Sequence, residues 1–133
     1  MGYVLVVDDN FLNVKLLEAR LQIASYDVRT AFGGEEALAR MREETPSIVL
    51  LDVMMPGMNG YEVCQWIRQN PATAEIPVIM VSALDKVSDR EAGLAAGADD
   101  YVNKPIEDDR LFESIRRLMD RARPSQSLAA RAV

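Results

Sequence analysis

The chain has 133 residues, a formal net charge of -6 at pH 7 and a pI of about 4.7. This length suits one domain with a proper core and leaves no room for a second full domain. The acidic balance argues against a nucleic-acid interface, which needs a clustered basic face. Histidine is absent and Cys64 is the single cysteine, which excludes Ser-His-Asp triads and the usual zinc sites. We expect Cys64 to be a buried apolar residue.

Five segments predict the strands of a parallel sheet. Residues 4–7, 48–51 and 78–81 are near-continuous apolar runs, which is typical of central strands covered on both faces. Residues 26–31 alternate apolar and polar side chains, and residues 99–102 are short and acidic. We therefore expect these last two segments to be edge strands that see water.

Apolar residues at helical spacing lie between these strands. The expected buried positions are Val14, Leu17, Leu21 and Ala24, then Ala37, Leu38 and Met41, then Val63 and Ile67, and finally Leu111, Ile115 and Leu118. Residues 89–96 predict a weaker helix ended by Gly97. Because strand and helix alternate five times, right-handed crossovers give an α/β fold with three layers. It is a doubly wound, flavodoxin-like parallel sheet with strand order 2-1-3-4-5.

This pattern covers residues 1–122, and residues 123–133 break it with Pro124 and a Ser/Gln/Ala-rich composition. We expect a flexible tail there, with a linker to a missing output domain as the alternative. No apolar run is long enough to cross a membrane, and the N-terminus begins directly in an expected strand. We therefore expect neither a signal peptide nor a membrane contact, and a cytoplasmic location.

Polar residues follow the expected strands at one edge of the sheet. They are Asp8-Asp9, Asp52, Ser82-Ala83 and Lys104-Pro105. The carboxyl ends of parallel strands converge on one crevice, so these side chains should meet there. Three carboxylates cannot stay ionised at close range without a cation, and Mg²⁺ prefers oxygen ligands. The sequence therefore predicts a metal site that serves phosphoryl chemistry.

Each of these residues also has a plainer interpretation. Asp8 or Asp9 could cap the following helix, although Asn10 would serve equally well. Ser82 could make an ordinary turn, and Lys104 could be an exposed solubilising side chain. Asp52 is the strongest candidate, because a carboxylate at the tip of a buried strand is a plausible nucleophile toward phosphorus.

At these residues the chain resembles the receiver domains of two-component response regulators, in register over residues 3 to 122. The resemblance rests on Val-Val-Asp8-Asp9, Leu-Leu-Asp52-Val-Met-Met-Pro-Gly-Met-Asn-Gly60, Val-Ser82-Ala83, Gly97-Ala98-Asp99-Asp100-Tyr101 and Lys104-Pro105. Asp8-Asp9-Asn10 with Asn13, and the run after Leu51, look most like the first receiver of PleD-type diguanylate cyclases. Any one of these motifs could arise by chance, but the ordered set is specific.

The resemblance implies a role for each site residue. Asp52 would accept a phosphoryl group from the phosphohistidine of a histidine kinase or histidine phosphotransfer protein, helped by Lys104. Mg²⁺ would be bound by Asp9, Asp52 and the backbone carbonyl of Met54, with Asp8 reaching it mainly through water.

The resemblance also implies a switch and a surface that it controls. Ser82 would move to the phosphoryl group and leave room for Tyr101 to turn inward. A homodimer on phosphorylation is a further implication, and the residues expected to form its charged surface are Arg90, Asp99, Asp100 and Arg117. The protein would be a signalling switch and not an enzyme beyond its own phosphoryl transfer and slow autodephosphorylation.

Alternative functions explain the sequence less well. A haloacid dehalogenase phosphatase would need a second Asp two residues after Asp52, where Met54 stands, and a flavodoxin would need a Ser/Thr/Gly-rich phosphate loop after the first strand. Phe32-Gly33-Gly34-Glu35-Glu36 superficially resembles a diguanylate cyclase signature but suits a helix entry. The remaining alternative is a phosphorylation-independent adaptor with the same fold, which the intact set of site residues disfavours.

Overall fold

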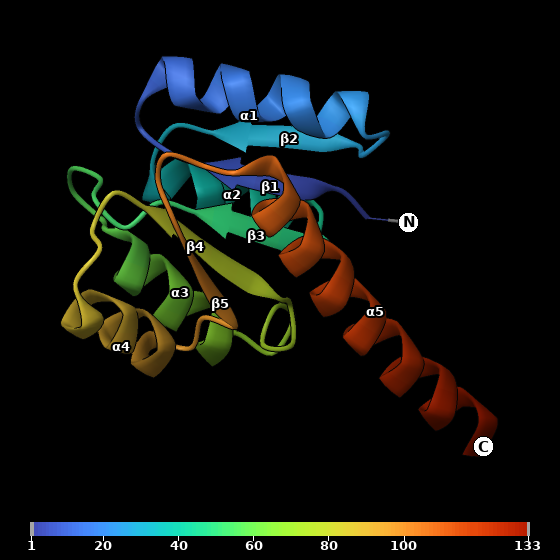
Figure 1. The fold of residues 1–133 in the computed structure, drawn as a ribbon. Coiled ribbons are helices and arrows are strands. Elements are labelled where there is room, and N and C mark those ends of the chain that lie inside the picture. Colours follow the sequence, from blue (N-terminus) through green and yellow to red (C-terminus); the bar gives the residue numbers. More distant parts are fainter. Residues whose placement is uncertain (1, 133) are drawn as a thin grey trace.

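The computed structural model describes the backbone of residues 2–132 and the side chains of residues 2–120. Within these residues five strands and five helices alternate (Figure 1). The strands are β1 (Val4–Val7), β2 (Val28–Ala31), β3 (Ile48–Leu51), β4 (Val78–Ser82) and β5 (Asp100–Asn103). The helices are α1 (Phe11–Ile23), α2 (Gly34–Glu43), α3 (Gly60–Gln69), α4 (Val87–Ala96) and α5 (Asp108–Ala132).

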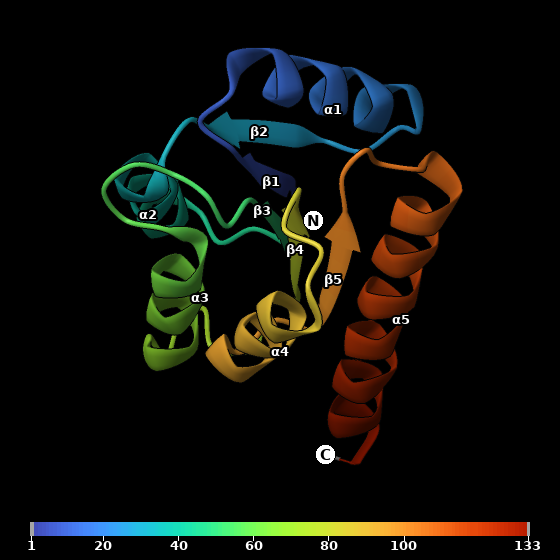
Figure 2. The same ribbon diagram turned by 60° about the vertical axis from the view of Figure 1, so that its left-hand side comes forward.

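All five strands pair in parallel in one sheet with the order β2-β1-β3-β4-β5, which confirms the predicted topology. The helices cover both faces (Figure 2): α1 and α5 lie on one side, and α2, α3 and α4 lie on the other. The strand residues alternate between these two layers. Leu5, Val7 and Leu51 face α2 and α3, whereas Val6 and Leu50 face α1 and α5.

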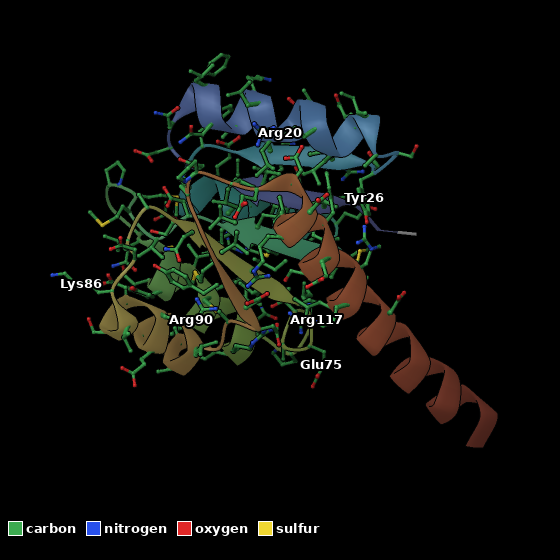
Figure 3. All side chains as sticks on the ribbon, in the orientation of Figure 1. Arg20, Tyr26, Glu75, Lys86, Arg90 and Arg117 are labelled. Atoms are coloured by element: carbon green, nitrogen blue, oxygen red, sulfur yellow. The ribbon has the colours of Figure 1, made fainter. Side chains whose placement is uncertain are left out.

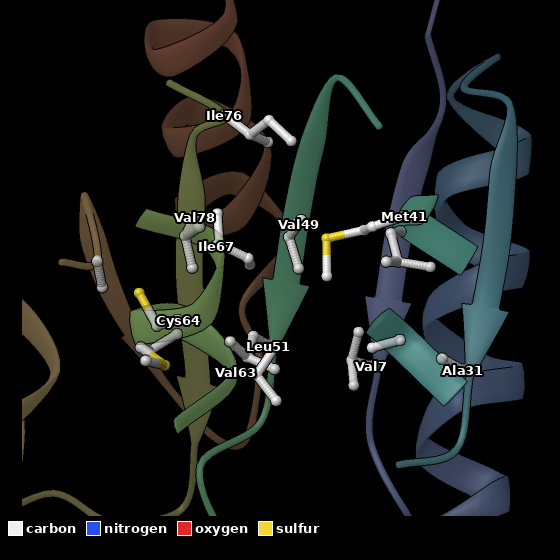
Figure 4. Close-up of a cluster of buried hydrophobic side chains, with 14 of the residues drawn as sticks. Val7, Ala31, Met41, Val49, Leu51, Val63, Cys64, Ile67, Ile76 and Val78 are labelled. Carbon is white, nitrogen blue, oxygen red and sulfur yellow. The ribbon is translucent and has the colours of Figure 1, made fainter. Parts of the chain in front are cut away.

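The helices are placed by the apolar positions that the sequence predicts. The buried predicted positions are Val14, Leu17, Leu21, Ala37, Leu38, Met41, Val63, Ile67, Leu111, Ile115 and Leu118, and Ala24 is exposed because it caps the end of α1. Cys64 is fully buried beside Val63 and Ile67 (Figure 4). Gly97 ends α4 with a φ of +113°, a conformation that costs glycine little.

Strand β5 lies at the edge of the sheet as predicted, but the expectation that it sees water is wrong. Strand β2 is half-exposed as predicted, but Asp100, Tyr101 and Val102 of β5 are buried because α4 and α5 cover both sides. The strand also starts one residue later than expected. The Asp99 carboxylate accepts the backbone N–H of Val78 at 2.9 Å, so regular pairing begins with Asp100.

Helix α5 continues through Pro124 to Ala132, so the segment expected to be a tail has a helical backbone. Its Ala, Leu, Arg and Gln residues have high helix propensity. The last turns project beyond the sheet (Figure 1). The role of this segment as a linker stays a prediction.

A buried carboxylate fastens α5 to the sheet. Both oxygens of Asp100 accept hydrogen bonds from Arg110 at 3.0 Å, and its Oδ2 also accepts from Ser114 at 2.6 Å and Arg117 at 3.0 Å. Burial opposes the charge on Asp100, but the hydrogen bonds from Arg110 and Ser114 outweigh it and lower the pKa to about 2. Ionised Asp100 therefore stabilises the folded state.

We predict that Asp100→Asn lowers the free energy of unfolding at pH 7 by about 2 kcal/mol, since each unit of pKa depression corresponds to about 1.4 kcal/mol. The ordinary Asp pKa exceeds the folded value, so the contribution is complete above about pH 5 and fades as pH falls toward 2. Urea titrations at pH 7, 4 and 2.5 measure the difference. The exposed Asp120→Asn on the same helix is the control, and a difference independent of pH would contradict the assignment.

Candidate functional site

The polar residues predicted to converge do lie at one edge of the sheet. Asp8 follows β1 and Asp52 follows the neighbouring strand β3. Ser82 is the last residue of β4, and Lys104 follows β5. Carboxylate oxygens of Asp8, Asp9 and Asp52 lie within 4.8 Å of one another. The crevice therefore contains a cluster of acidic side chains with one ammonium group beside it.

The capping role belongs to Asn10 and not to either aspartate. Its side chain accepts the backbone N–H of Asn13 at 2.9 Å and so begins α1. Asp8 accepts the N–H of Asn10 at 2.9 Å through Oδ1, which leaves Oδ2 directed toward Lys104. Asp8 is buried and Asp9 is exposed. The pair thus offers one carboxylate fixed in the crevice and one open to solvent.

Asp52 is held at the floor of the crevice. Its Oδ1 accepts the N–H of Val53 at 2.8 Å, and only 6% of the residue is exposed. Burial first and the negative charge of Asp8 second raise the pKa of Asp52 to about 6, against the opposing effect of Lys104. A cation that enters the crevice would therefore stabilise the ionised form of Asp52.

Lys104 points into the crevice, as the sequence predicts. Its backbone N–H donates to the carbonyl of Ser82 at 2.9 Å, and the peptide bond to Pro105 is cis. The ammonium lies 2.8 Å from Asp8 Oδ2 and 3.7 Å from Asp52 Oδ2. The side chain is largely withdrawn from solvent, so the exposed, solubilising interpretation does not hold.

The loop between β3 and α3 is shaped by its turn residues. Gly57 has a φ of +72°, and Asn59 caps α3 in a reciprocal capping box with Glu62. A Cβ atom at Gly60 would lie 2.2 Å from the carbonyl oxygen of Asp52, so only glycine permits this approach. Met54, in the same loop, has an exposed side chain.

Ser82 and Tyr101 meet at the loop that follows β4. Ser82 is fully buried, and its Oγ accepts the N–H of Leu84 at 3.1 Å. The Tyr101 hydroxyl donates to the carbonyl of Leu84 at 2.8 Å, and its ring is 2% exposed. The ring therefore occupies the inward position.

Two asparagines near the site were not singled out for a role by sequence reasoning. Asn13 Nδ2 lies 3.5 Å from Asp8 Oδ2, and Asn103 Nδ2 donates to the carbonyl of Leu84 at 2.8 Å. Asn103 follows Tyr101 by two residues in β5. Because side chains repeat every two residues along a strand, this spacing was the available signal.

The residues expected to form a charged surface are only partly brought together. Arg90 on α4 and Arg117 on α5 are labelled in Figure 3. Both approach Asp100, at 4.0 and 3.0 Å. Asp99 instead binds Arg68 of α3 at 2.8 Å. Arg110 and Ser114 also bind Asp100, and the sequence did not indicate either of them.

The comparisons with known proteins agree with this geometry. Residues 4–116 match the response regulator receiver domain family. Over 115 residues the chain is 50% identical to the response regulator PleD of Caulobacter vibrioides, covering 86% of this chain and 25% of PleD. It is 50% identical over 119 residues to the probable transcriptional regulator ycf27 of Porphyra purpurea, covering 90% of this chain and 48% of that protein.

A solved structure shares the fold. The crystal structure of a putative response regulator from Chloroflexus aurantiacus matches with a TM-score of 0.86 and 37% identity, over 90% of this chain and 98% of that one. The chain therefore belongs to the response regulator receiver domain family, the phosphoacceptor class of two-component signalling. The predicted likeness to PleD is confirmed.

The chain spans between a quarter and a half of the length of the two curated relatives. Receiver domains are signalling switches that accept phosphate from histidine kinases, and they generally bind Mg²⁺ at an acidic pocket. The cluster of Asp8, Asp9 and Asp52 fits such an ion, because its oxygen ligands are close and their charges are only partly offset by Lys104. Among the described residues, no helix is both long and apolar enough to cross a membrane.

We predict that Asp52→Asn raises the free energy of unfolding at pH 7 without divalent ions by about 1–3 kcal/mol, because it removes a buried charge that Asp8 repels. Millimolar Mg²⁺ should stabilise the native chain more than the variant, since a ligand stabilises the state that binds it. Thermal melts with and without Mg²⁺ measure both effects. Equal Mg²⁺ stabilisation of the two proteins would count against the acidic cluster as the metal site.

Proposed function

We propose that Asp52 is the phosphoacceptor of this receiver. The observation that carries the proposal is the buried Asp52 carboxylate with the Lys104 ammonium 3.7 Å from its Oδ2. A carboxylate oxygen of Asp52 would attack the phosphorus of a partner's phosphohistidine. An O–P bond would form, the P–N bond would break, and the imidazole would leave with the bonding electron pair. The donor must be another protein, since this chain has no histidine.

We infer that Mg²⁺ is held by Asp9, Asp52 and the backbone carbonyl of Met54, with Asp8 contributing mainly through water. The short separations within the acidic cluster support this assignment. The ion would supply positive charge next to the phosphoryl oxygens. Lys104 now pairs with Asp8 and lies close enough to Asp52 to turn its ammonium toward a phosphoryl group there. Most of the catalysis would come from this charge compensation.

The donor protein would bind beside the crevice, on the outer face of α1. Four apolar side chains of this helix are strongly exposed, namely Phe11, Leu12, Leu16 and Ile23. Leu12 and Leu16 are one helical turn apart, and Ile23 continues the same stripe. Leu16 also lines a cavity of about 210 Å³ that reaches Asp8, Asp52 and Lys104. A histidine kinase or phosphotransfer protein that covers this stripe would bring its phosphohistidine to Asp52.

Ser82 and Tyr101 would transmit the effect of phosphorylation from Asp52 to the surface of the domain. The Ser82 hydroxyl would donate to the phosphoryl group, and Tyr101 would fix the loop before α4. The affected surface comprises α4, β5 and α5, where Arg90 and Arg117 flank Asp100. A homodimer formed through this surface is our proposal, although Asp99 would have to exchange its contact with Arg68. The chain would not bind nucleic acid itself.

We also infer the setting in which this receiver works. Its cytoplasmic location follows from the proposed exchange with a histidine kinase. Residues 123–133 would lead to an output domain, which the partial coverage of both curated relatives supports. Beyond its own phosphoryl transfer and slow autodephosphorylation the receiver would catalyse nothing.

We predict that acetyl phosphate with Mg²⁺ adds one phosphoryl group to the native chain and none to Asp52→Ala, as measured by intact mass. Asp85→Asn, a change at an exposed aspartate in the loop after β4, is the matched control and should be phosphorylated normally. Light scattering after size exclusion on the same samples should show the dimer. No addition, together with no binding of the mimic beryllofluoride, would favour the phosphorylation-independent adaptor.

We predict a long-lived phosphoryl group on Asp52. Met54 and Leu84, which lie two residues after Asp52 and Ser82, have side chains that cannot orient an attacking water by hydrogen bonding. Met54→Asn supplies an exposed polar group there and should speed dephosphorylation roughly tenfold or more, within the range of positioned acid–base groups. The decay of phosphorylated protein by intact mass gives the rate. Met54→Leu is the control, and equal decay in both variants would refute the explanation.

A further inference from the structure

The backbone of a single residue in the loop after β4, Leu84, is held by three side chains. The N–H of Leu84 donates to Ser82 Oγ at 3.1 Å. The carbonyl of Leu84 accepts hydrogen bonds from the Tyr101 hydroxyl and from Asn103 Nδ2, each at 2.8 Å. A carbonyl oxygen has two lone pairs, so the two donors do not compete. The loop that receives Tyr101 is therefore fixed from β4 on one side and from β5 on the other.

Asn103 is well placed for this contact because of its position in β5. It is the last residue of the strand and pairs with Ser82 of β4. Tyr101 lies two residues earlier, so both side chains leave the same face of the sheet and reach one carbonyl. Asn103 is exposed, whereas Tyr101 is buried. The Asn103 amide thus binds the Leu84 carbonyl from the solvent side, and the Tyr101 hydroxyl binds it from the interior.

A glycine in α4 leaves room for the ring of Tyr101 in its inward position. A Cβ atom at Gly93 would lie 3.0 Å from Cδ2 of Tyr101 and 3.5 Å from Cγ of Met80. The guanidinium of Arg90 lies over the ring, 5.8 Å from its centroid. The inward site is therefore formed by α4, by β4 and by the carbonyl of Leu84.

We propose that Asn103 is a positioning residue for the inward state of Tyr101. By holding the Leu84 carbonyl toward the sheet, its amide keeps in place the acceptor that the Tyr101 hydroxyl needs. Without that donor the loop turns its carbonyl to water, and the Tyr101 hydroxyl loses the acceptor that lies 2.8 Å away. The consequence for signalling rests on the proposed function: Asn103 favours the phosphorylated form by preparing the position of Tyr101.

Fluorine NMR of protein labelled with 3-fluorotyrosine tests the positioning role without any phosphoryl group. The chain has four tyrosines, and Tyr101→Phe identifies the resonance of interest. Asn103→Ala and the near-isosteric Asn103→Asp should shift the ring toward solvent, which the H₂O/D₂O isotope shift of this resonance measures. Loss of one hydrogen bond corresponds to a change of about two- to tenfold in the inward-to-outward ratio.

Three comparisons make this test specific. Asn103→Gln keeps a donor and should restore much of the inward population. Asn70→Asp makes the same change at the end of α3, where the side chain only accepts a hydrogen bond, and should leave Tyr101 unaffected. The buried Tyr3 resonance reports whether each variant is folded. An unchanged Tyr101 isotope shift in folded Asn103→Ala and Asn103→Asp would overturn the proposal.

Beryllofluoride titrations separate this proposal from the proposed function. If both hold, Asn103→Ala binds beryllofluoride about two- to tenfold more weakly than the native chain, in step with its fluorine result. If the native chain binds none, the proposed function fails while the fluorine result still decides the role of Asn103. If Asn103→Ala has a changed isotope shift but binds beryllofluoride as tightly as the native chain, Asn103 positions Tyr101 and the proposed effect on signalling is wrong.

Discussion

The placement of two carboxylates in one buried crevice sets the electrostatics of the site. Asp8 and Asp52 end neighbouring central strands, and the sheet holds them close where water is scarce. Burial and the charge of Asp8 raise the pKa of Asp52, so its ionised form carries a cost that Lys104 only partly offsets. A cation bound in this crevice would relieve the imbalance that the fold imposes, and the same positive charge would offset the negative charge of a phosphoryl group on Asp52. The large apolar core supplies the stability that tolerates it.

A second carboxylate, Asp100, has the opposite electrostatics. It is buried, but Arg110, Arg117 and Ser114 surround it, and the hydrogen bonds from Arg110 and Ser114 lower its pKa to about 2. The negative charge of the Asp8 and Asp52 centre is therefore only partly offset, whereas that of Asp100 is neutralised by its partners, which fasten α5 to the sheet. The two centres lie toward opposite ends of β5, since Lys104 follows the strand that Asp100 begins. Tyr101 and Asn103 lie between them, so this short strand connects the crevice to the surface of α4 and α5.

Glycines lie where the chain passes closest to these centres. A side chain at Gly60 would strike the carbonyl of Asp52, and one at Gly93 would press on the ring of Tyr101. The first glycine lets the loop after β3 close over the acidic cluster, and the second lets α4 accept the tyrosine. Both positions are set by backbone and side-chain approaches between separate elements, which is why neither is explained by local turn chemistry alone.

The sequence by itself determined the sheet, its strand order and the acidic crevice, because apolar runs, helical spacing and polar residues after each strand are local patterns with one consistent topology. It misjudged the exposure of β5, whose burial depends on how α4 and α5 pack, and it did not indicate Arg110 and Ser114 as partners of Asp100 or Asn103 as the partner of Leu84. Only the tertiary structure decided that Asn10 caps α1, that Asp99 binds Arg68, and that Tyr101 points inward. In each case the sequence offers several possible partners, and the partner that forms the contact is the one that the folded chain brings within hydrogen-bonding distance.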